Sequence, residues 1–195
     1  MLAFTNIYCC IAFWLVYAIW AISELTRAVI LRPGKDAKRQ DRGSRPIVMA
    51  ASAICAWVAF FVVFALPGAA IAGNSPIVFS IGLTLMLAGM AFRWYAVRTL
   101  GRFFTFEVAI SPDHQVVQSG PYRYIRHPSY SGTLVTLIGL GLTLTNWASL
   151  AVILLISSAG LLYRIRVEEE ALANELGQPY LDYMKRTRRL IPFVF

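Results

Sequence analysis

The sequence is poor in charged side chains, and this scarcity limits the kinds of protein that it can encode. Only 14% of the 195 residues are charged, whereas about 25% is usual for a soluble globular domain. Hydrophobic residues make up 58% of the chain, and the mean hydropathy is +0.61. These values exclude an ordinary soluble domain and predict an integral membrane protein.

Cysteine and histidine are also scarce, which argues against a disulfide framework or a metal centre. Cys9, Cys10 and Cys55 all fall in apolar runs without Cys-x-x-Cys spacing, so we interpret them as small packing residues. The two histidines, His114 and His127, have no cysteine or carboxylate at ligand spacing beside them. Because a catalytic metal site needs about three protein ligands, no metal is predicted.

Long uncharged runs show where the chain crosses the membrane, since a span needs about 20 apolar residues. We predict an all-α integral membrane protein, a single domain over residues 1–195, with five transmembrane helices. The spans are expected at about residues 2–23, 47–66, 76–92, 129–145 and 147–163. The last two are joined by a tight turn, so we expect them to form a helical hairpin.

The basic residues predict the orientation of these spans. All 18 Lys and Arg fall within 24–45, 93–128 or 164–195, which lie on one side if there are five spans. The positive-inside rule makes that side the cytoplasm, with the N-terminus outside. The net charge of +8 also suits contact with anionic lipid head groups. Nucleic-acid binding is not predicted, because the basic run 32–45 contains two aspartates and no aromatic residue for stacking.

A polar strip directly before the fourth span is the first candidate site. Proline is favoured at the first position of a helix, so Pro128 is predicted to start the helix and His127 to lie just outside it. The free N–H groups of Ser129, Tyr130 and Ser131 would then favour an anion. The alternative is an interfacial belt of Tyr and Arg that binds no ligand.

A second candidate follows the fifth span, which we expect to continue as a helix past Tyr163. Arg164 and Glu168 are four residues apart, so they share one helix face and could hold a zwitterionic ligand. The alternative is a simple salt bridge in the head-group zone. Gly177 is predicted to end this helix, and a short amphipathic helix with two tyrosines should follow.

Residues 103–192 resemble the isoprenylcysteine carboxyl methyltransferases, integral membrane enzymes that use S-adenosylmethionine, and especially their small prokaryotic relatives with five spans. The motifs that carry this resemblance are His114-Gln115-Val116-Val117, Gly120-Pro121-Tyr122, Arg126-His127-Pro128-Ser129-Tyr130-Ser131-Gly132, Glu168-Glu169-Glu170, Gly177, Tyr180, Tyr183 and Pro192. The Arg-His-Pro-x-Tyr-x-Gly element also occurs in related lipid methyltransferases and, more loosely, in membrane sterol reductases.

The resemblance implies a role for individual residues. The cofactor pocket would be lined by His114, Gln115, Val116, Val117, Tyr122, His127, Pro128, Ser129, Tyr130 and Glu168. Arg164 would bind the substrate carboxylate, and Arg164 and Glu168 would be the catalytic residues. A further cofactor contact would lie near Glu107 or Val108. The cytoplasmic connector and the C-terminal helices would together form this site.

We therefore expect methyl transfer from S-adenosylmethionine to a lipophilic or lipidated acceptor, with S-adenosylhomocysteine as the product. The family default is carboxyl O-methylation of an isoprenylcysteine-like substrate by a monomer embedded among membrane lipids. A phospholipid or small-amine N-methyltransferase would also fit, and Glu168 or Glu169 would then serve as the base. A sterol-reductase-like NADPH enzyme and a membrane scaffold without catalytic activity are the remaining two hypotheses.

Overall fold

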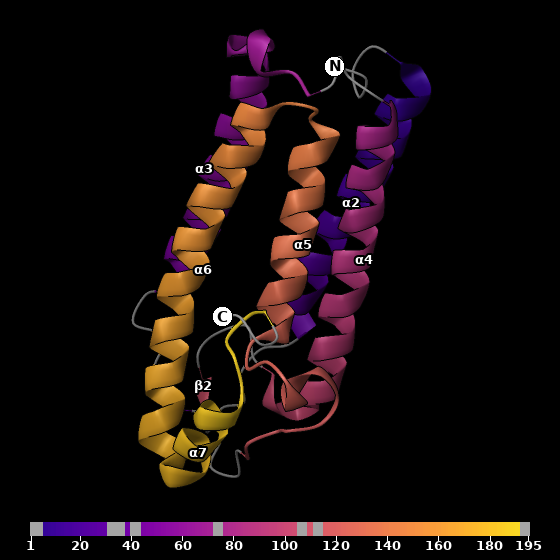
Figure 1. Ribbon diagram of the computed structural model, residues 1–195. Helices are drawn as coiled ribbons and strands as arrows, with labels where there is room; N and C mark the ends of the chain where they lie inside the picture. The colour runs from indigo at the N-terminus through magenta and orange to yellow at the C-terminus, as the bar shows by residue number, and fades with distance from the viewer. Residues whose placement is uncertain are drawn as a thin grey trace.

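The computed structural model describes residues 6–30, 38–39, 44–71, 76–104, 109–110 and 115–191. Five long helices and one short helix run through this part of the chain (Figure 1). They are α2 (Ile7–Ile30), α3 (Ser44–Ala65), α4 (Pro76–Leu100), α5 (Pro128–Thr143), α6 (Trp147–Leu176) and α7 (Gln178–Arg186). Three single-turn 3-10 helices connect them: η1 (Pro67–Ala69), η2 (Gly101–Phe103) and η3 (Gly120–Arg123).

Each predicted span coincides with one of the five long helices. Helices α2, α4 and α6 continue past the predicted ends of their spans, because the charged residues that follow each apolar run find partners and do not stop the helix. By length and composition, three helical stretches among the described residues could cross a membrane: α2, α4 with η2, and α6. The mostly helical membrane fold is thus confirmed, and the count of five crossings stays a prediction.

The connections between helices gather at two opposite ends of the bundle. At one end, the backbone N–H of Ile71 donates to the Thr145 carbonyl over 2.9 Å, and the Asn146 amide donates to the Leu66 carbonyl over 2.9 Å. At the other end, β1 (Lys38–Arg39) and β2 (Ala109–Ile110) form an antiparallel pair that the all-α prediction did not include. The two polar connectors therefore meet at the end that carries α7 (Figure 1).

Helices α4 and α5 approach each other closely through glycines on both partners. A Cβ atom added at Gly89 would lie 2.5 Å from the backbone nitrogen of Thr136, and one at Gly139 would lie 2.5 Å from that of Met86. Small residues of this kind let helix backbones pack tightly in membranes, where there is no hydrophobic drive between helices. This contact fixes where α5 begins and thereby positions the residues around His127.

The bundle buries a continuous apolar core while its outer surface remains apolar too. The core joins side chains from all five long helices, among them Phe13, Cys55, Met86, Leu140 and Ile153. The buried position of Cys55 agrees with its predicted packing role. Large hydrophobic side chains are also exposed along the outside of the helices, as expected where lipid rather than water surrounds a protein.

Candidate functional site

His127 occupies the N-cap position of α5, directly before Pro128, as the sequence predicted. Its ring is buried, and its backbone N–H donates to the Arg189 carbonyl over 3.0 Å. The expectation of free N–H groups at this helix start was wrong for two of the three residues. The N–H groups of Tyr130 and Ser131 both donate to the His127 carbonyl, at 3.0 and 3.1 Å, because the capping residue turns its carbonyl into the first helical turn.

The Tyr130 hydroxyl joins the two candidate sites that the sequence identified separately. It donates to the Glu168 carboxylate over 2.7 Å and accepts from Nε of Arg164 over 2.9 Å. The Tyr130 ring also stacks on His127, with ring centroids 5.6 Å apart and 20° between the planes. The imidazole before α5 and the guanidinium of α6 therefore converge on one tyrosine.

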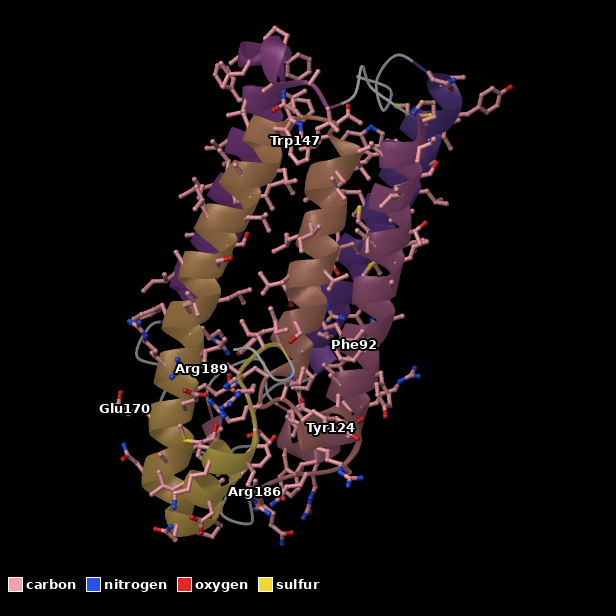
Figure 2. All side chains as sticks on the ribbon, viewed as in Figure 1. Phe92, Tyr124, Trp147, Glu170, Arg186 and Arg189 are labelled. Atoms are coloured by element: carbon pink, nitrogen blue, oxygen red, sulfur yellow. The ribbon has the colours of Figure 1, made fainter. Side chains whose placement is uncertain are left out.

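The Glu169 carboxylate gathers three basic side chains, and we call Arg126, His127, Glu169 and Arg189 the Glu169 cluster. Its Oε1 atom lies 2.8 Å from Nε of Arg126 and 3.4 Å from Nε2 of His127. Its Oε2 atom lies 2.8 Å from a terminal nitrogen of Arg189. Glu169 is 5% exposed, and its contacts with Arg126 and His127 are buried, whereas Arg189 is partly exposed. Figure 2 shows Arg189 on the inner side of α6, whereas Glu170 points away from the bundle.

Residues 187–190, which we call the tail strap, lie along the segment that leads into α5. The Arg126 N–H donates to the Arg188 carbonyl over 2.7 Å, and the Arg188 N–H donates to the Tyr124 carbonyl over 3.2 Å. The Ser131 hydroxyl donates to the Leu190 carbonyl over 2.6 Å. The strap therefore holds the C-terminal end of the described chain against the start of α5.

Tyrosines from η3 and α7 complete the site with neutral hydroxyls. Burial and the nearby Glu168 carboxylate raise the pKa of Tyr122, and burial raises the pKa of Tyr183, so both hydroxyls stay protonated near neutral pH. The Tyr183 hydroxyl donates to the Tyr122 carbonyl over 2.7 Å, which fixes α7 against η3. Beside the Glu169 cluster, the site thus offers the Glu168 carboxylate, the Arg164 guanidinium and several buried aromatic rings.

Comparisons with known proteins match this region. Residues 81–174 fit the model of the "Isoprenylcysteine carboxyl methyltransferase (ICMT) family". Protein-S-isoprenylcysteine O-methyltransferase B of Arabidopsis thaliana is 35% identical over 115 residues, which cover 58% of this chain and 58% of that protein. Protein-S-isoprenylcysteine O-methyltransferase of Tribolium castaneum is 30% identical over 182 residues, covering 92% of this chain and 64% of the relative.

A solved structure agrees with these sequence matches. A eukaryotic intramembrane Ras methyltransferase ICMT superimposes with a TM-score of 0.60 and 28% identity, covering 76% of this chain and 53% of the solved one. The chain is therefore similar to the isoprenylcysteine carboxyl methyltransferase family over residues 81–174. It spans 58% and 64% of the length of the Arabidopsis and Tribolium relatives.

The stretch that fits the isoprenylcysteine methyltransferase model holds most of the site but not all of it. It includes His127, Tyr130, Arg164 and Glu168, which the structure brings together. It ends before α7 and the tail strap, so Arg189 reaches Glu169 from outside the matched stretch. The isoprenylcysteine methyltransferase motif is therefore completed by contacts from the C-terminal segment.

Some predicted cofactor residues are not brought into this cluster. His114, like Glu107, Val108 and Pro192, lies outside the described residues. In the segment leading to η3, Gln115 is exposed, and Val116 and Val117 are half-buried. Their assignment to the cofactor site remains a prediction that rests on the resemblance.

The residues at the site fit a ligand such as S-adenosylmethionine, which carries a carboxylate, an ammonium group and a flat purine. In the described part of the chain, the hydroxyls of Ser129 and Tyr180 are buried without a hydrogen-bond partner. A buried hydroxyl without a partner is costly, so these two groups are suited to bonding a ligand. Glu168 adds a carboxylate for the ammonium group of such a ligand.

A buried ionic cluster between α2, α4 and α5 was not predicted from the sequence. Arg93 approaches Glu24 over 3.2 Å, and its guanidinium also donates to the hydroxyl of Thr133 and to the Ser129 carbonyl. Arg27 is fully buried and pairs with Glu24. The sequence signal was the i, i+3 spacing of Glu24 and Arg27, but nothing in the sequence linked that pair to Arg93, which is 69 residues after Glu24.

A hollow of about 440 Å³ on the outer face of α4 lies away from this site. Its lining is formed by Pro76, Ile77, Ser80, Ile81, Thr84 and Leu85. It contains no titratable side chain and sits at the end of α4 opposite Arg93. The hollow therefore lacks groups suited to catalysis, and we place the candidate active site at the start of α5.

Proposed function

We propose that this protein transfers a methyl group from S-adenosylmethionine to the carboxylate of an isoprenylated cysteine at the membrane. One observation carries the proposal: the Tyr130 hydroxyl links Arg164 to Glu168 beside the buried ring of His127. All four residues lie in the stretch that fits the isoprenylcysteine methyltransferase family. Similarity to the isoprenylcysteine methyltransferases supports the reaction type, and the geometry supports the residues.

The residues suit a displacement that needs position rather than acid–base chemistry. S-adenosylmethionine supplies an activated methyl group when it is bound. A C-terminal carboxylate has a pKa of about 3.5, so it is already ionised at neutral pH and needs no base. The guanidinium of Arg164 orients this carboxylate, and Tyr130 holds Nε of that guanidinium in place over 2.9 Å. The buried aromatic rings exclude water from the reacting atoms.

The position of the site at one end of an apolar bundle suits two very different substrates. A prenyl chain enters from the bilayer between helices whose outer surfaces are apolar. A water-soluble cofactor enters from the side that carries the connectors and α7. By the positive-inside rule we assign that side to the cytoplasm, with the N-terminus outside.

N-methylation of a phospholipid or a small amine is the second candidate, favoured by one observation. Glu168 carries a carboxylate in the centre of the site, and its side chain is 28% exposed. An ammonium acceptor must lose a proton before it attacks, and this carboxylate could accept that proton. The choice of acceptor therefore separates the two candidates.

Methyl transfer by the purified protein in lipid vesicles tests the proposal. Radiolabelled S-adenosylmethionine would be mixed with a prenylated cysteine that has a free carboxylate, with the same compound lacking its prenyl group, or with phosphatidylethanolamine. We expect label to enter the prenylated acid as a base-labile ester and to remain low with the other two. Transfer to phosphatidylethanolamine alone would favour N-methylation, and stabilisation by NADPH without any transfer would favour a reductase.

A further inference from the structure

Glu169 is the group in the site whose role neither the motif nor the proposed reaction accounts for. It follows Glu168 in the chain but faces a different set of partners. Its two oxygens contact Arg126, His127 and Arg189, which come from the segment before α5 and from the tail strap. Buried carboxylates are retained where each oxygen is paired, and this one is paired on both.

The contact with Glu169 determines which ring nitrogen of His127 carries a hydrogen. Glu169 is ionised beside two guanidinium groups, and an ionised carboxylate can only accept hydrogen bonds. The Nε2 atom, 3.4 Å from Oε1 of Glu169, must therefore carry the ring proton. In a neutral ring the Nδ1 atom is then an acceptor, and it lies 3.9 Å from Oε2 of Glu168. That separation is too long for a hydrogen bond between them.

We infer that Glu169 is a positioning residue that holds the His127 ring with its Nδ1 lone pair facing Glu168. The Nδ1 atom and the Glu168 carboxylate then both accept hydrogen bonds from an N–H donor of the bound ligand. The inference rests on the proposed function, and the ligand group that fits is an ammonium or amino group. Glu169 itself is held by Arg126 and Arg189, so the tail strap acts on the ring through this carboxylate. Stacking of Tyr130 on the imidazole also limits rotation of the ring.

The hydrogen bond can be measured without any ligand. In protein with ¹⁵N-labelled histidine, the Nε2–H proton of His127 should be protected from exchange with water, because its acceptor is buried. His114→Gln assigns the signal, since the chain has two histidines. Glu169→Ala should abolish the protected signal, whereas Glu170→Ala, an exposed neighbour, should leave it unchanged. A protected signal that persists in folded Glu169→Ala protein would overturn the inference.

The consequence for binding is tested by a double-mutant cycle read as the affinity for S-adenosylhomocysteine. Loss of a carboxylate that orients a functional histidine costs about 10- to 100-fold in metal centres, and we expect a loss of that size for Glu169→Ala. In a His127→Ala background the same change should cost nothing further, because Glu169 acts through the ring. Equal losses in both backgrounds would show a purely structural role and contradict the inference.

Two results keep this test separate from the proposed function. If Glu169→Ala does not fold, Glu169→Met combined with Arg189→Met removes the Glu169–Arg189 pair, while Arg126 keeps its hydrogen bonds to the Met184 and Thr187 carbonyls. The same readouts apply with the same expected losses. If the unmodified protein does not bind S-adenosylhomocysteine, the proposed function fails. The dependence of the Nε2–H signal on Glu169 still supports or overturns the placement of the ring.

Discussion

The two faces of α5 are built in opposite ways, although they belong to one helix of 16 residues. The face towards α4 carries Gly132 and Gly139, which bring the two backbones into direct contact. The face towards α6 and the tail strap carries Tyr130 and Ser131, whose hydroxyls bind groups on other elements. Figure 1 shows α5 between these two sets of neighbours.

The glycine face fixes the position of the site, and the polar face supplies the groups that can bind a ligand. The glycine face leaves no room for movement, because the nearest atoms are backbone atoms of the partner helix. The polar face is made of hydrogen bonds, and a side chain in a hydrogen bond can exchange one partner for a ligand at little cost. Substitutions on the first face should therefore reduce the stability of the bundle, and substitutions of the groups around Tyr130 on the second should reduce activity.

The largest expected effect is on activity, from the arginine that α6 brings to the polar face. Arg164→Ala removes the proposed partner of the substrate carboxylate, and a hydrogen bond to a charged group is worth about 1.5–3 kcal/mol. We expect kcat/KM for the prenylated acid to fall about 100-fold, with binding of S-adenosylhomocysteine retained. Arg166→Ala, an exposed neighbour on α6, is the control and should be nearly silent. Equal loss of cofactor binding would show that Arg164 has another role.

The glycine face should give the largest loss of stability. Gly89→Ala places a Cβ 2.5 Å from the Thr136 backbone nitrogen, so the helices must move apart. The clash should cost about 3 kcal/mol and outweigh the roughly 1 kcal/mol that alanine gains over glycine in a helix. Thermal unfolding in detergent measures the net loss of about 2 kcal/mol. Gly68→Ala meets no atom within 4 Å and should leave the Tm unchanged.

A single hydroxyl on the polar face should have a smaller, purely functional effect. Tyr130→Phe keeps the ring that stacks on His127 but removes the link between Arg164 and Glu168. We expect turnover to fall about 10-fold, equivalent to roughly 1.4 kcal/mol, with little change in Tm. Tyr163→Phe, on the exposed side of α6, is the matched control. Unchanged turnover in Tyr130→Phe would mean that the link is not used in the reaction.

The smallest effect is expected where the tail strap meets α5. Ser131→Ala removes the hydrogen bond to the Leu190 carbonyl and should cost about 1 kcal/mol. Hydrogen exchange of residues 187–190 should accelerate, while exchange in the α4–α5 contact stays slow. The exposed Ser80→Ala on α4 serves as the control. If the strap exchanges no faster, it is held by the Glu169 cluster alone.

Sequence patterns predicted the helices well because the rules they use are local. The uncharged runs located all five long helices, Pro128 marked the start of α5, and Gly177 marks the end of α6 with a φ of 59°. The continuation of α6 past Tyr163 was also predicted. The resemblance brought Tyr130, Arg164 and Glu168 into the candidate site, where the structure joins them.

The contacts between distant segments could not be predicted in the same way. Arg189 reaches Glu169 because the tail strap runs beside the start of α5, and no local signal reports that course. Arg93 and Glu24 pair because α2 packs against α4. The pairing of β1 with β2 likewise depends on two connectors meeting in space. Each of these three contacts depends on the tertiary arrangement, which cannot be predicted from composition and residue spacing.

Thermal unfolding of the detergent-solubilised protein measures whether S-adenosylhomocysteine binds at the polar face of α5. At a ligand concentration of about 100 times Kd, the native state should gain about 2.7 kcal/mol and the Tm should rise. The rise should persist in Tyr163→Phe and largely disappear in His127→Ala. No rise in the unmodified protein, or an equal rise in His127→Ala, would contradict the account.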